Sequence, residues 1–346
     1  MKILVIGGTG FIGRPLVCEL SAMGHAVAVL TRNASSTGLP ADSIVGERGD
    51  LATLRPQADV VIDLILSSGA QAGTLMEAFR GVASRVVAAS SIDVYRACGV
   101  LHGSEEGPLE PVLLTEDSAL RTKLQTYPPA SVKALQKIFP WLDDEYDKIP
   151  VERAILSDPL LPGTVLRLPM IYGPGDRLHR LQPVLKRIDD GRRKILLEKG
   201  WADWRSPRGY VDNVAAAIAL AAVSGQAAGR VYNVAELPAF SEREWAGKIA
   251  AAAGWTGEFV MVPKDRMPAH LAQKGNSAQH WSADSSRIRR ELGYREPVPF
   301  DEAIARTIAW ERGNPPGELN PNRFDYAAED EAGKGFEPPM NADERR

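Results

Sequence analysis

Short apolar runs alternate with helical patterns along the first half of the chain. The runs are rich in Val and Ile without strict polar alternation, which is typical of strands covered on both faces in a parallel sheet. They span residues 2–7, 26–31, 59–66 and 85–90. Helical spacing appears at residues 14–24 and 70–82, with Pro15 in a first turn and Gly24 at a helix end. The pattern predicts an α/β fold, a Rossmann-type doubly wound parallel sheet.

The periodicity breaks at residues 98–145, an acidic segment that contains several prolines. A stretch of this length without a regular pattern inside a compact domain is usually functional or mobile. A helix is predicted next, at about residues 149–157, and then a strand at 163–173. We expect a dinucleotide-binding domain over residues 1–175, with the inserted segment inside it, and a smaller, interleaved substrate-binding region over residues 176–312.

Residues 313–346 are rich in Pro, Gly and Glu, a composition that buries little apolar surface, and they are predicted to form a tail. In the alternative, Phe324, Tyr326 and Phe336 dock this segment onto the body of the protein. No internal repeat interrupts the organisation of the chain.

The overall composition is that of an ordinary soluble globular protein. Of the 346 residues, 44% are hydrophobic and 25% charged, and a net charge of −3 does not favour nucleic-acid binding. Cys18 and Cys98 form neither a metal-ligand spacing nor a disulfide framework, which fits a reducing cytoplasm. No apolar run approaches the roughly 20 residues that span a bilayer. We expect a cytoplasmic protein with a small-molecule substrate and no metal, and a homodimer stays open.

The sequence GGTGFIG, residues 7–13, follows the first strand and opens the first helix. Gly7 permits the tight turn, Gly10 lets the backbone approach a pyrophosphate, and Gly13 lets the helix pack close to the strand. The helix N-terminus then offers free N–H groups to the negative charge. The sequence therefore predicts a dinucleotide site, with contacts from Gly7, Thr9, Gly10, Phe11, Ile12 and Gly13.

A dinucleotide site usually has an acidic residue at the end of the second strand, where it holds the ribose 2′-hydroxyl. Here Thr31 and Arg32 stand at that position. A guanidinium pairs with a 2′-phosphate, so Arg32 favours NADP, with NAD as the alternative cofactor and a solvated surface arginine as the alternative role. In the sequence GDL, residues 49–51, Asp50 is expected beside Leu51 at the adenine, or as the cap of the next helix.

Several further motifs follow the glycine loop in a fixed order over residues 1–312. They are GDL at 49–51, SSIDVY at 90–95, TED at 115–117, YGPGD at 172–176, RGYVDNVAAAIALA at 208–221, YNVA at 232–235 and ELGYREPVPFDEAIARTIAWE at 291–311. In this order the chain resembles the extended short-chain dehydrogenase/reductases, the NAD-dependent epimerase/dehydratase group. The resemblance implies a cofactor in the first domain, a substrate in the cleft beside the second region, and a Ser/Thr–Tyr–Lys catalytic set.

In the family the tyrosine exchanges a proton with the substrate, and the lysine lowers the pKa of that tyrosine and holds the nicotinamide ribose. A free tyrosine has a pKa of about 10 and needs such a nearby cation to act at neutral pH. The resemblance places the catalytic hydroxyl four residues before Tyr95, at Ser91. Ser91 follows the carboxyl end of a strand, where α/β sheets place ligands, and a turn-forming serine is the alternative.

The tyrosine and lysine of this chain depart from the family spacing. The family places the tyrosine four residues before the lysine, one helical turn away. Lys148 keeps the family position because Glu152 follows it by four residues, but Asp144 stands where the tyrosine is expected, and Tyr146 lies only two residues before the lysine.

Pro150 suggests how the site is rebuilt. Proline is tolerated in a first helical turn, so we expect the helix to begin near Asp147 or Lys148, with Asp147 as its cap. Tyr146 then lies just outside the helix, where its ring can reach the usual position. Two alternatives stay open: a site without a relay tyrosine, in which Lys148, Ser91 or a substrate group acts, and a cofactor-binding protein without turnover.

The family usually has a short link between TED and the tyrosine, whereas residues 118–145 intervene here. This part of the insertion contains Tyr127 and Trp141 and is expected as a lid or as a surface or dimer element. Met170 stands where nucleotide-sugar enzymes often carry asparagine, which does not favour such a substrate, and Pro169 is expected beside the nicotinamide. Candidate substrate contacts are Arg177, His179, Trp204, Arg205 and Arg208.

These observations predict an NAD(P)-dependent oxidoreductase or epimerase that acts on a small hydroxyl or carbonyl substrate. Ser91, Tyr146 and Lys148 are its expected proton relay, and Lys148 also contacts the cofactor. The alternative is an NADP-binding regulatory or scaffold protein without turnover.

Overall fold

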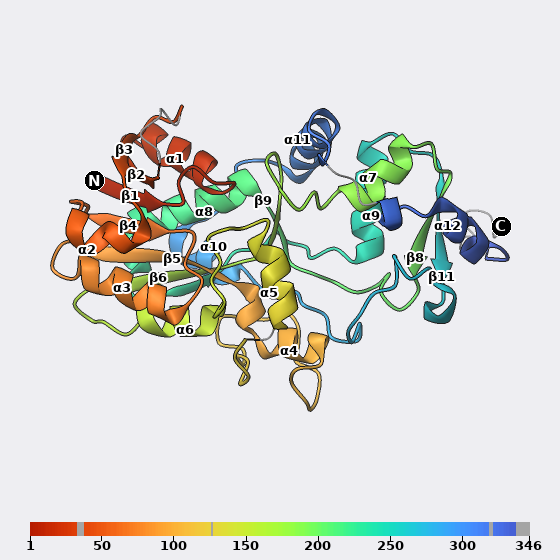
Figure 1. Cartoon of the computed structure of the whole chain (residues 1–346), viewed down its shortest axis with the longest axis horizontal. Helices are drawn as coiled ribbons and strands as arrows, with labels where there is room; N and C mark the ends of the chain where they lie inside the picture. Colours follow the sequence, from red (N-terminus) through yellow and green to blue (C-terminus); the bar gives the residue numbers. More distant parts are fainter. Residues whose placement is uncertain (33–37, 126, 318–320, 337–346) are drawn as a thin grey trace.

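The centre of the computed structural model, which describes residues 1–32, 38–125, 127–317 and 321–336, is a seven-stranded parallel sheet (Figure 1). In spatial order its strands are β10 (Val231–Asn233), β6 (Gly163–Leu168), β5 (Arg85–Ser91), β4 (Val60–Asp63), β1 (Lys2–Ile6), β2 (Ala26–Thr31) and β3 (Asp42–Val45). The strands run outward from β1 in both directions, so the prediction of a doubly wound α/β sheet is confirmed. The strand predicted at 163–173 divides at Pro169, which has no N–H for a ladder.

Alternate residues of β1 face two separate cores. Ile3 and Val5 pack with helices α1 (Gly13–Ala22) and α8 (Val211–Val223) on one face of the sheet. Leu4 and Ile6 pack with α3 (Gly69–Phe79) and α6 (Lys148–Ile155) on the other face. Burial on both faces explains why the strand sequences are apolar throughout.

Only part of the second region, around β8 and β11, lies at the end of the molecule opposite β1–β3 (Figure 1), whereas α8 and β10 of the same region belong to the layers of the central sheet. Two small parallel sheets pair β7 (Met170–Tyr172), just before this region, with β9 (Arg208–Tyr210), and β8 (Lys194–Glu198) with β11 (Glu258–Val262). The other α-helices are α2 (Leu51–Leu54), α4 (Arg96–His102), α5 (Pro129–Gln136), α7 (Gln182–Asp189), α9 (Glu242–Ala252), α10 (Ser286–Leu292), α11 (Phe300–Gly313) and α12 (Tyr326–Gly333). Short 3-10 turns η1 to η5 are Arg48–Asp50, Ile92–Val94, Gly225–Ala227, Lys264–Arg266 and Pro321–Arg323. Within the described ranges, no helix has both the length and the apolar character to cross a bilayer.

The segment predicted as a tail packs back onto the second region where it is described. Arg187 of α7 and Glu329 of α12 form a buried ion pair of 2.5 Å. The guanidinium of Arg187 also lies 4.9 Å from the ring centroid of Phe324, and Phe336 packs against the apolar cluster of β8 and β11. The Tyr326 hydroxyl donates a hydrogen bond to Asp190. These contacts correspond to the docked alternative, and residues 318–320 and 337–346 lie outside the described part.

Candidate active site

The loop between β1 and α1 is a tight turn, closed by a 3.0 Å hydrogen bond from Gly10 N to Gly7 O. Gly7 has a φ of 85°, in the left-handed region that favours glycine. A Cβ atom at Gly13 would lie 2.2 Å from Gly7 O, so the close approach of helix and loop requires a glycine there. Thr9 and Gly10 are exposed at the tip of the loop. This backbone cradle at a helix N-terminus fits the pyrophosphate of a dinucleotide.

The glycine loop borders the start of the second region. A Cβ atom at Gly175 would lie 3.4 Å from Cδ2 of Phe11, and Phe11 and Ile12 both pack against the larger core. Gly175 belongs to the motif YGPGD. The motif therefore brings the second region to the edge of the predicted cofactor site.

The residues predicted to hold the adenosine half occupy the carboxyl edge of β2 and the turn after β3. Arg32 is exposed directly after β2, and Thr31 is half-buried at the strand end. The Asp50 carboxylate accepts the Glu47 N–H at 2.8 Å, which stabilises the start of η1, and the side chain of Leu51 is fully buried. The Asp50 side chain therefore takes part in the cap of η1, and although Asp50 directly precedes α2, its side chain makes no capping hydrogen bond to that helix.

An ion pair that was not predicted lies at the same edge of the sheet. Arg48 binds the carboxylate of Asp63 through both Nη atoms, at 2.5 and 2.8 Å, and Asp63 is fully buried at the end of β4. Oδ1 of Asp63 also accepts the N–H of Ile65 at 2.9 Å. The available signal was a lone aspartate inside an apolar strand, since buried carboxylates are rarely unpaired.

Helix α6 begins at Lys148, as Pro150 predicted. The Asp147 side chain caps the helix by accepting the N–H of Ile149 at 2.8 Å. Pro150 then falls in the first turn, where its missing N–H breaks no helical hydrogen bond. Tyr146 therefore lies outside the helix, and the predicted late start and Asp147 cap are confirmed.

Lys148 points inward beneath the carboxyl edge of the sheet. Its Nζ donates to the carbonyl of Ala89 at 3.0 Å and to that of Leu66, and the residue is only 4% exposed. Burial lowers the pKa of Lys148 to about 8, although nearby Asp93 and Asp63 act in the opposite direction. The rings of Trp141 and Tyr146 cover the ammonium, with centroids 5.7 and 5.9 Å from Nζ. The lysine is thus a buried cation at the end of β5.

Ser91 and Tyr146 contact different groups of Asp93: Tyr146 binds its side chain, whereas Ser91 caps η2 through the backbone N–H of Asp93, the turn role given as the alternative for this serine. The Tyr146 hydroxyl donates to Oδ2 of Asp93 at 3.3 Å, while Oγ of Ser91 accepts the backbone N–H of Asp93 at 3.2 Å. Burial, followed by the negative charge of Asp93, raises the pKa of Tyr146 well above its ordinary value. Tyr95 is separate from this group, because its hydroxyl donates to Asn233 in the core at 2.6 Å.

The inserted segment contributes a second phenol to the same carboxylate. Tyr127 donates to Oδ2 of Asp93 at 3.3 Å, and its ring centroid lies 6.1 Å from that of Tyr146. Burial raises the pKa of Tyr127 well above its ordinary value as well. The sequence predicts Tyr127 only as part of the insertion, because no local motif links it to Asp93.

A buried ion pair fastens the insertion to the start of α6. Arg121 binds Asp147 with 3.1 Å between Nη2 and Oδ1, and both side chains are almost fully buried. Gln125 N donates to Oδ2 of Asp147 at 2.6 Å, and Arg121 Nε donates to the carbonyl of Asp93 at 2.6 Å. The insertion therefore lies against the candidate catalytic residues.

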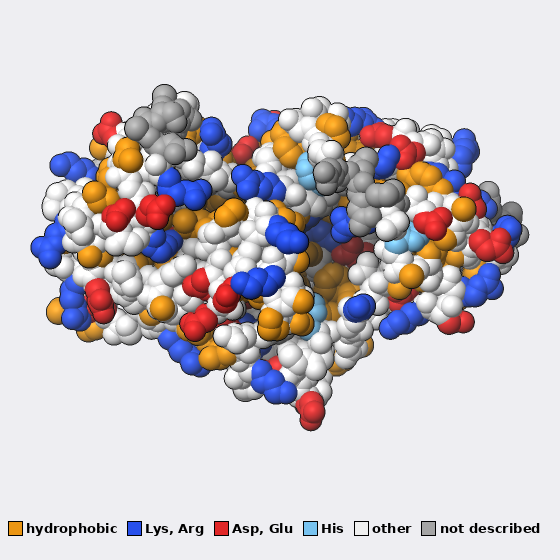
Figure 2. Space-filling model, in the orientation of Figure 1, with side chains coloured by type: hydrophobic (Ala, Val, Ile, Leu, Met, Phe, Trp, Pro, Cys, Tyr) orange, Lys and Arg blue, Asp and Glu red, His pale blue; other side chains and the backbone are white. Residues whose placement is uncertain are grey.

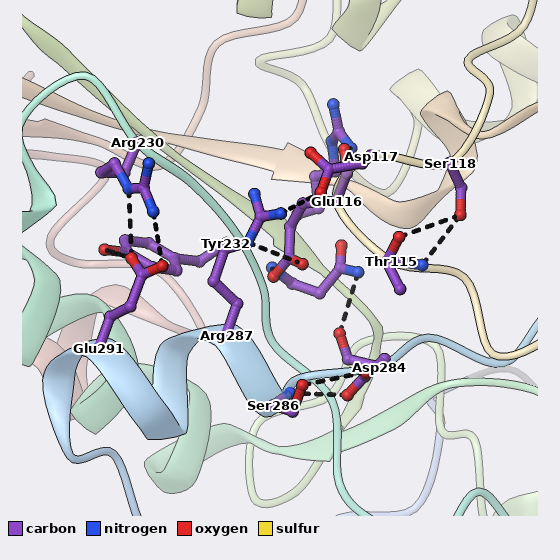
Figure 3. Close-up of polar contacts among 12 residues, drawn as sticks. Thr115, Glu116, Asp117, Ser118, Arg230, Tyr232, Asp284, Ser286, Arg287 and Glu291 are labelled. Atoms are coloured by element: carbon purple, nitrogen blue, oxygen red, sulfur yellow. Dashed lines mark hydrogen bonds and ion pairs between the residues drawn. The ribbon is translucent and has the colours of Figure 1, made fainter.

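The TED motif, also within the insertion, forms a polar cluster beside β10, the outer strand on the side of the sheet opposite β3. Figure 3 shows Arg287 of α10 beside Glu116 and Asp117, and its Nε lies 3.4 Å from Oε2 of Glu116. The other carboxylate oxygen of Glu116 accepts the N–H of Asn233 in β10 at 2.9 Å. This motif anchors the insertion to β10 and α10, which is a structural role.

The predicted substrate contacts are engaged in internal interactions. The pairs are Arg177 with the carbonyl of Ile138, His179 with Glu311, Trp204 with the carbonyl of Gln279, Arg205 with Glu244, and Arg208 with Glu242. Trp204 and Arg208 are buried, whereas Arg177 is exposed and His179 partly so. Arg177, His179 and Arg205 thus keep accessible surface.

The surface is hollowed between the two regions, and Lys and Arg side chains surround this hollow on the face shown in Figure 2. A separate cavity of about 510 Å³ is lined by residues of 192–196 and 329–336, far along the chain from the glycine loop. It takes no lining residue from the Ser91, Tyr146 and Lys148 group.

Comparison with known proteins agrees with this architecture. The model of the NAD dependent epimerase/dehydratase family matches residues 3–112. The chain is 28% identical to a 3-diazoavenalumate denitrifying reductase of a Streptomyces species, over 86% of this chain and 97% of the relative. It is also 28% identical to 2-alkyl-3-oxoalkanoate reductase of Stenotrophomonas maltophilia, over 89% and 99% of the two chains.

Among solved structures, MoeE5 in complex with UDP-glucuronic acid and NAD has a TM-score of 0.64 and 21% identity, covering 90% of this chain and 99% of that one. At this identity the likeness concerns the fold alone. Over residues 3–112, and through the two relatives, the chain is similar to the NAD-dependent epimerase/dehydratase family of extended short-chain dehydrogenase/reductases. It is an epimerase/dehydratase-like, NAD(P)-dependent enzyme.

Proposed function

We propose that the protein reduces or oxidises a small carbonyl or hydroxyl substrate with a nicotinamide cofactor, and that Ser91, Tyr146 and Lys148 handle the proton. The observation that carries this proposal is the place of Tyr146, which binds the Asp93 carboxylate two residues after Ser91 and lies over the buried ammonium of Lys148. The two relatives that match over nearly their full length are both named as reductases, which supports the reductive direction. A 2-alkyl-3-oxoalkanoate is the substrate class we place first.

The cofactor would be held by the glycine loop residues Gly7 to Gly13, with Lys148 at the nicotinamide ribose and Pro169 beside the ring. When bound, it supplies or accepts the hydride. We propose NADP as the preferred form, because Arg32 is exposed at the end of β2, where a carboxylate would otherwise bind the ribose 2′-hydroxyl. Thr31, Asp50 and Leu51 complete the proposed adenosine side.

The binding and proton-transfer roles are then assigned to residues of the chain. The Ser91 hydroxyl orients the reacting oxygen, and Tyr146 exchanges a proton with it. The charge of Lys148 favours the ionised phenol, but burial and Asp93 oppose this effect. The inserted segment, fixed by Arg121 and Asp147, keeps water from the proton-exchanging groups.

The test is consumption of NADPH and NADH, followed by nicotinamide absorbance, over a panel of 3-oxoalkanoates, other small carbonyl compounds and nucleotide sugars. We expect turnover with a 3-oxo acid and a preference for NADPH that Arg32→Ala removes. The matched control is Arg55→Ala, a substitution on an exposed arginine after α2. Tight NADPH binding without turnover across the panel would instead favour a regulatory or scaffold protein.

A further inference from the structure

Asp93 is a buried carboxylate whose two oxygens differ in their hydrogen bonds. The residue is 3% exposed, and its Oδ2 accepts hydrogen bonds from Tyr127 and Tyr146, both at 3.3 Å. Its Oδ1 is also buried and has no hydrogen-bond partner among the residues that the structure describes. A buried anion with one oxygen lacking a donor is poorly stabilised and takes up a proton readily.

The groups around Asp93 act in both directions. Burial raises the pKa of the Asp93 carboxyl, while the charges of Arg121 and Lys148 lower it. The surrounding titratable and charged groups are Cys98 from α4, Arg121 and Tyr127 from the insertion, and Tyr146, Asp147 and Lys148 at the start of α6. The two cations stabilise the carboxylate, which can accept a proton, and burial stabilises the neutral acid, which can donate one.

We propose that Asp93 is the proton partner of Tyr146, an inference that rests on the proposed function. During oxidation the phenol oxygen takes the proton of the substrate hydroxyl, while the phenol proton passes to Oδ2 of Asp93. Two O–H bonds break and two form, and the substrate carbon loses its hydride with the electron pair to the nicotinamide. Reduction reverses each transfer. The exchange needs no free tyrosinate, which the high phenol pKa disfavours.

Asp93 acts through Tyr146 and is therefore a positioning residue, with Tyr127 as a second donor that holds Oδ2 in place. This role differs from that of the family's lysine, because it supplies a proton acceptor instead of a cation. The insertion also gains a function in this scheme, because Arg121 donates to the backbone carbonyl of Asp93 and Tyr127 donates to its carboxylate.

The first experiment titrates tyrosine ionisation by ultraviolet absorbance in the protein without cofactor or substrate. In Asp93→Asn the negative charge is absent, so we expect tyrosinate to appear at lower pH than in the wild type. Adding Tyr146→Phe to this variant removes part of the shifted signal. Asp158→Asn is the control, since Asp158 pairs with Arg80 at the surface. An Asp93→Asn titration identical to that of the wild type would overturn the proposal, and thermal unfolding checks that each variant is folded.

The second experiment uses the substrate found in the panel. We expect Asp93→Asn to lower kcat on the order of 10²-fold with little change in KM, and Asp93→Glu to restore part of the loss. If Tyr146→Phe abolishes turnover but Asp93→Asn retains it with the same pH profile, the proposal is wrong and the proposed function stands. Absence of any wild-type turnover contradicts the proposed function alone, because the absorbance titration needs no substrate.

Discussion

Arg121 and Asp147 form a buried ion pair that joins the insertion to the first turn of α6. The Nη2–Oδ1 distance is 3.1 Å, and the Asp147 carboxylate also caps the helix through Ile149 N. One carboxylate thus fixes both the place where α6 begins and the place where the insertion lies. The position of Tyr146 just before the helix depends on this arrangement.

Removing Arg121 should therefore destabilise the protein strongly. Arg121→Ala leaves Asp147 as a buried charge without its cation, and we expect a loss of about 3–5 kcal/mol in the free energy of unfolding. Lys133→Ala is the matched control: it breaks the exposed pair of Lys133 with Asp144 and should cost less than about 1 kcal/mol. Urea unfolding measures both free energies. Equal losses in the two variants would contradict the claim that the buried Arg121–Asp147 pair stabilises the fold more than the exposed pair.

The glycine loop makes a prediction about cofactor binding. In Gly13→Ala the new Cβ would approach Gly7 O to 2.2 Å, so the loop must shift and we expect NADPH binding to be lost. Gly73→Ala, in α3, meets no atom within 4 Å and should keep wild-type affinity while stabilising the helix by roughly 0.5–1 kcal/mol. Calorimetric titration with NADPH decides; wild-type affinity in Gly13→Ala would refute the cradle.

The buried ammonium of Lys148 predicts a pH dependence of stability. Its pKa falls from an ordinary 10.5 to about 8 in the folded protein, so between these values the unfolded chain binds the proton and the folded chain does not. Stability contributed by this residue therefore rises as pH increases from about 8 towards 10.5. Unfolding free energies of the wild type and Lys148→Met, compared across this range, should show the rise only in the wild type. Parallel curves would mean that the ammonium is not destabilised by burial.

Local rules in the sequence predicted much of the fold and part of the site. The apolar strands identified the doubly wound sheet, and Pro150 with Asp147 identified the start of α6, because a first turn and its cap depend on neighbouring residues. The glycine loop was recognisable for the same reason.

The Asp93 cluster needed tertiary information. Asp93 is separated from Tyr127 and Tyr146 by 34 and 53 residues, and no periodic pattern joins them. The ion pair of Arg48 with Asp63 was likewise hidden, because it depends on how the turn after β3 folds over the sheet edge. The composition of residues 313–346 predicted a tail, but α12 packs onto the second region through Glu329. One buried ion pair leaves little trace in composition.

Tyr146 is proposed to exchange the proton with the substrate despite its displaced position, and this role is the central claim to test. The direct measurement is kcat with the substrate and cofactor identified in the panel, for Tyr146→Phe and for Asp144→Asn at the usual family position. Asp144 is exposed and paired with Lys133. We predict a loss of 10²-fold to 10⁴-fold, to order of magnitude, in Tyr146→Phe and wild-type kcat in Asp144→Asn. Undiminished kcat in Tyr146→Phe would contradict the account.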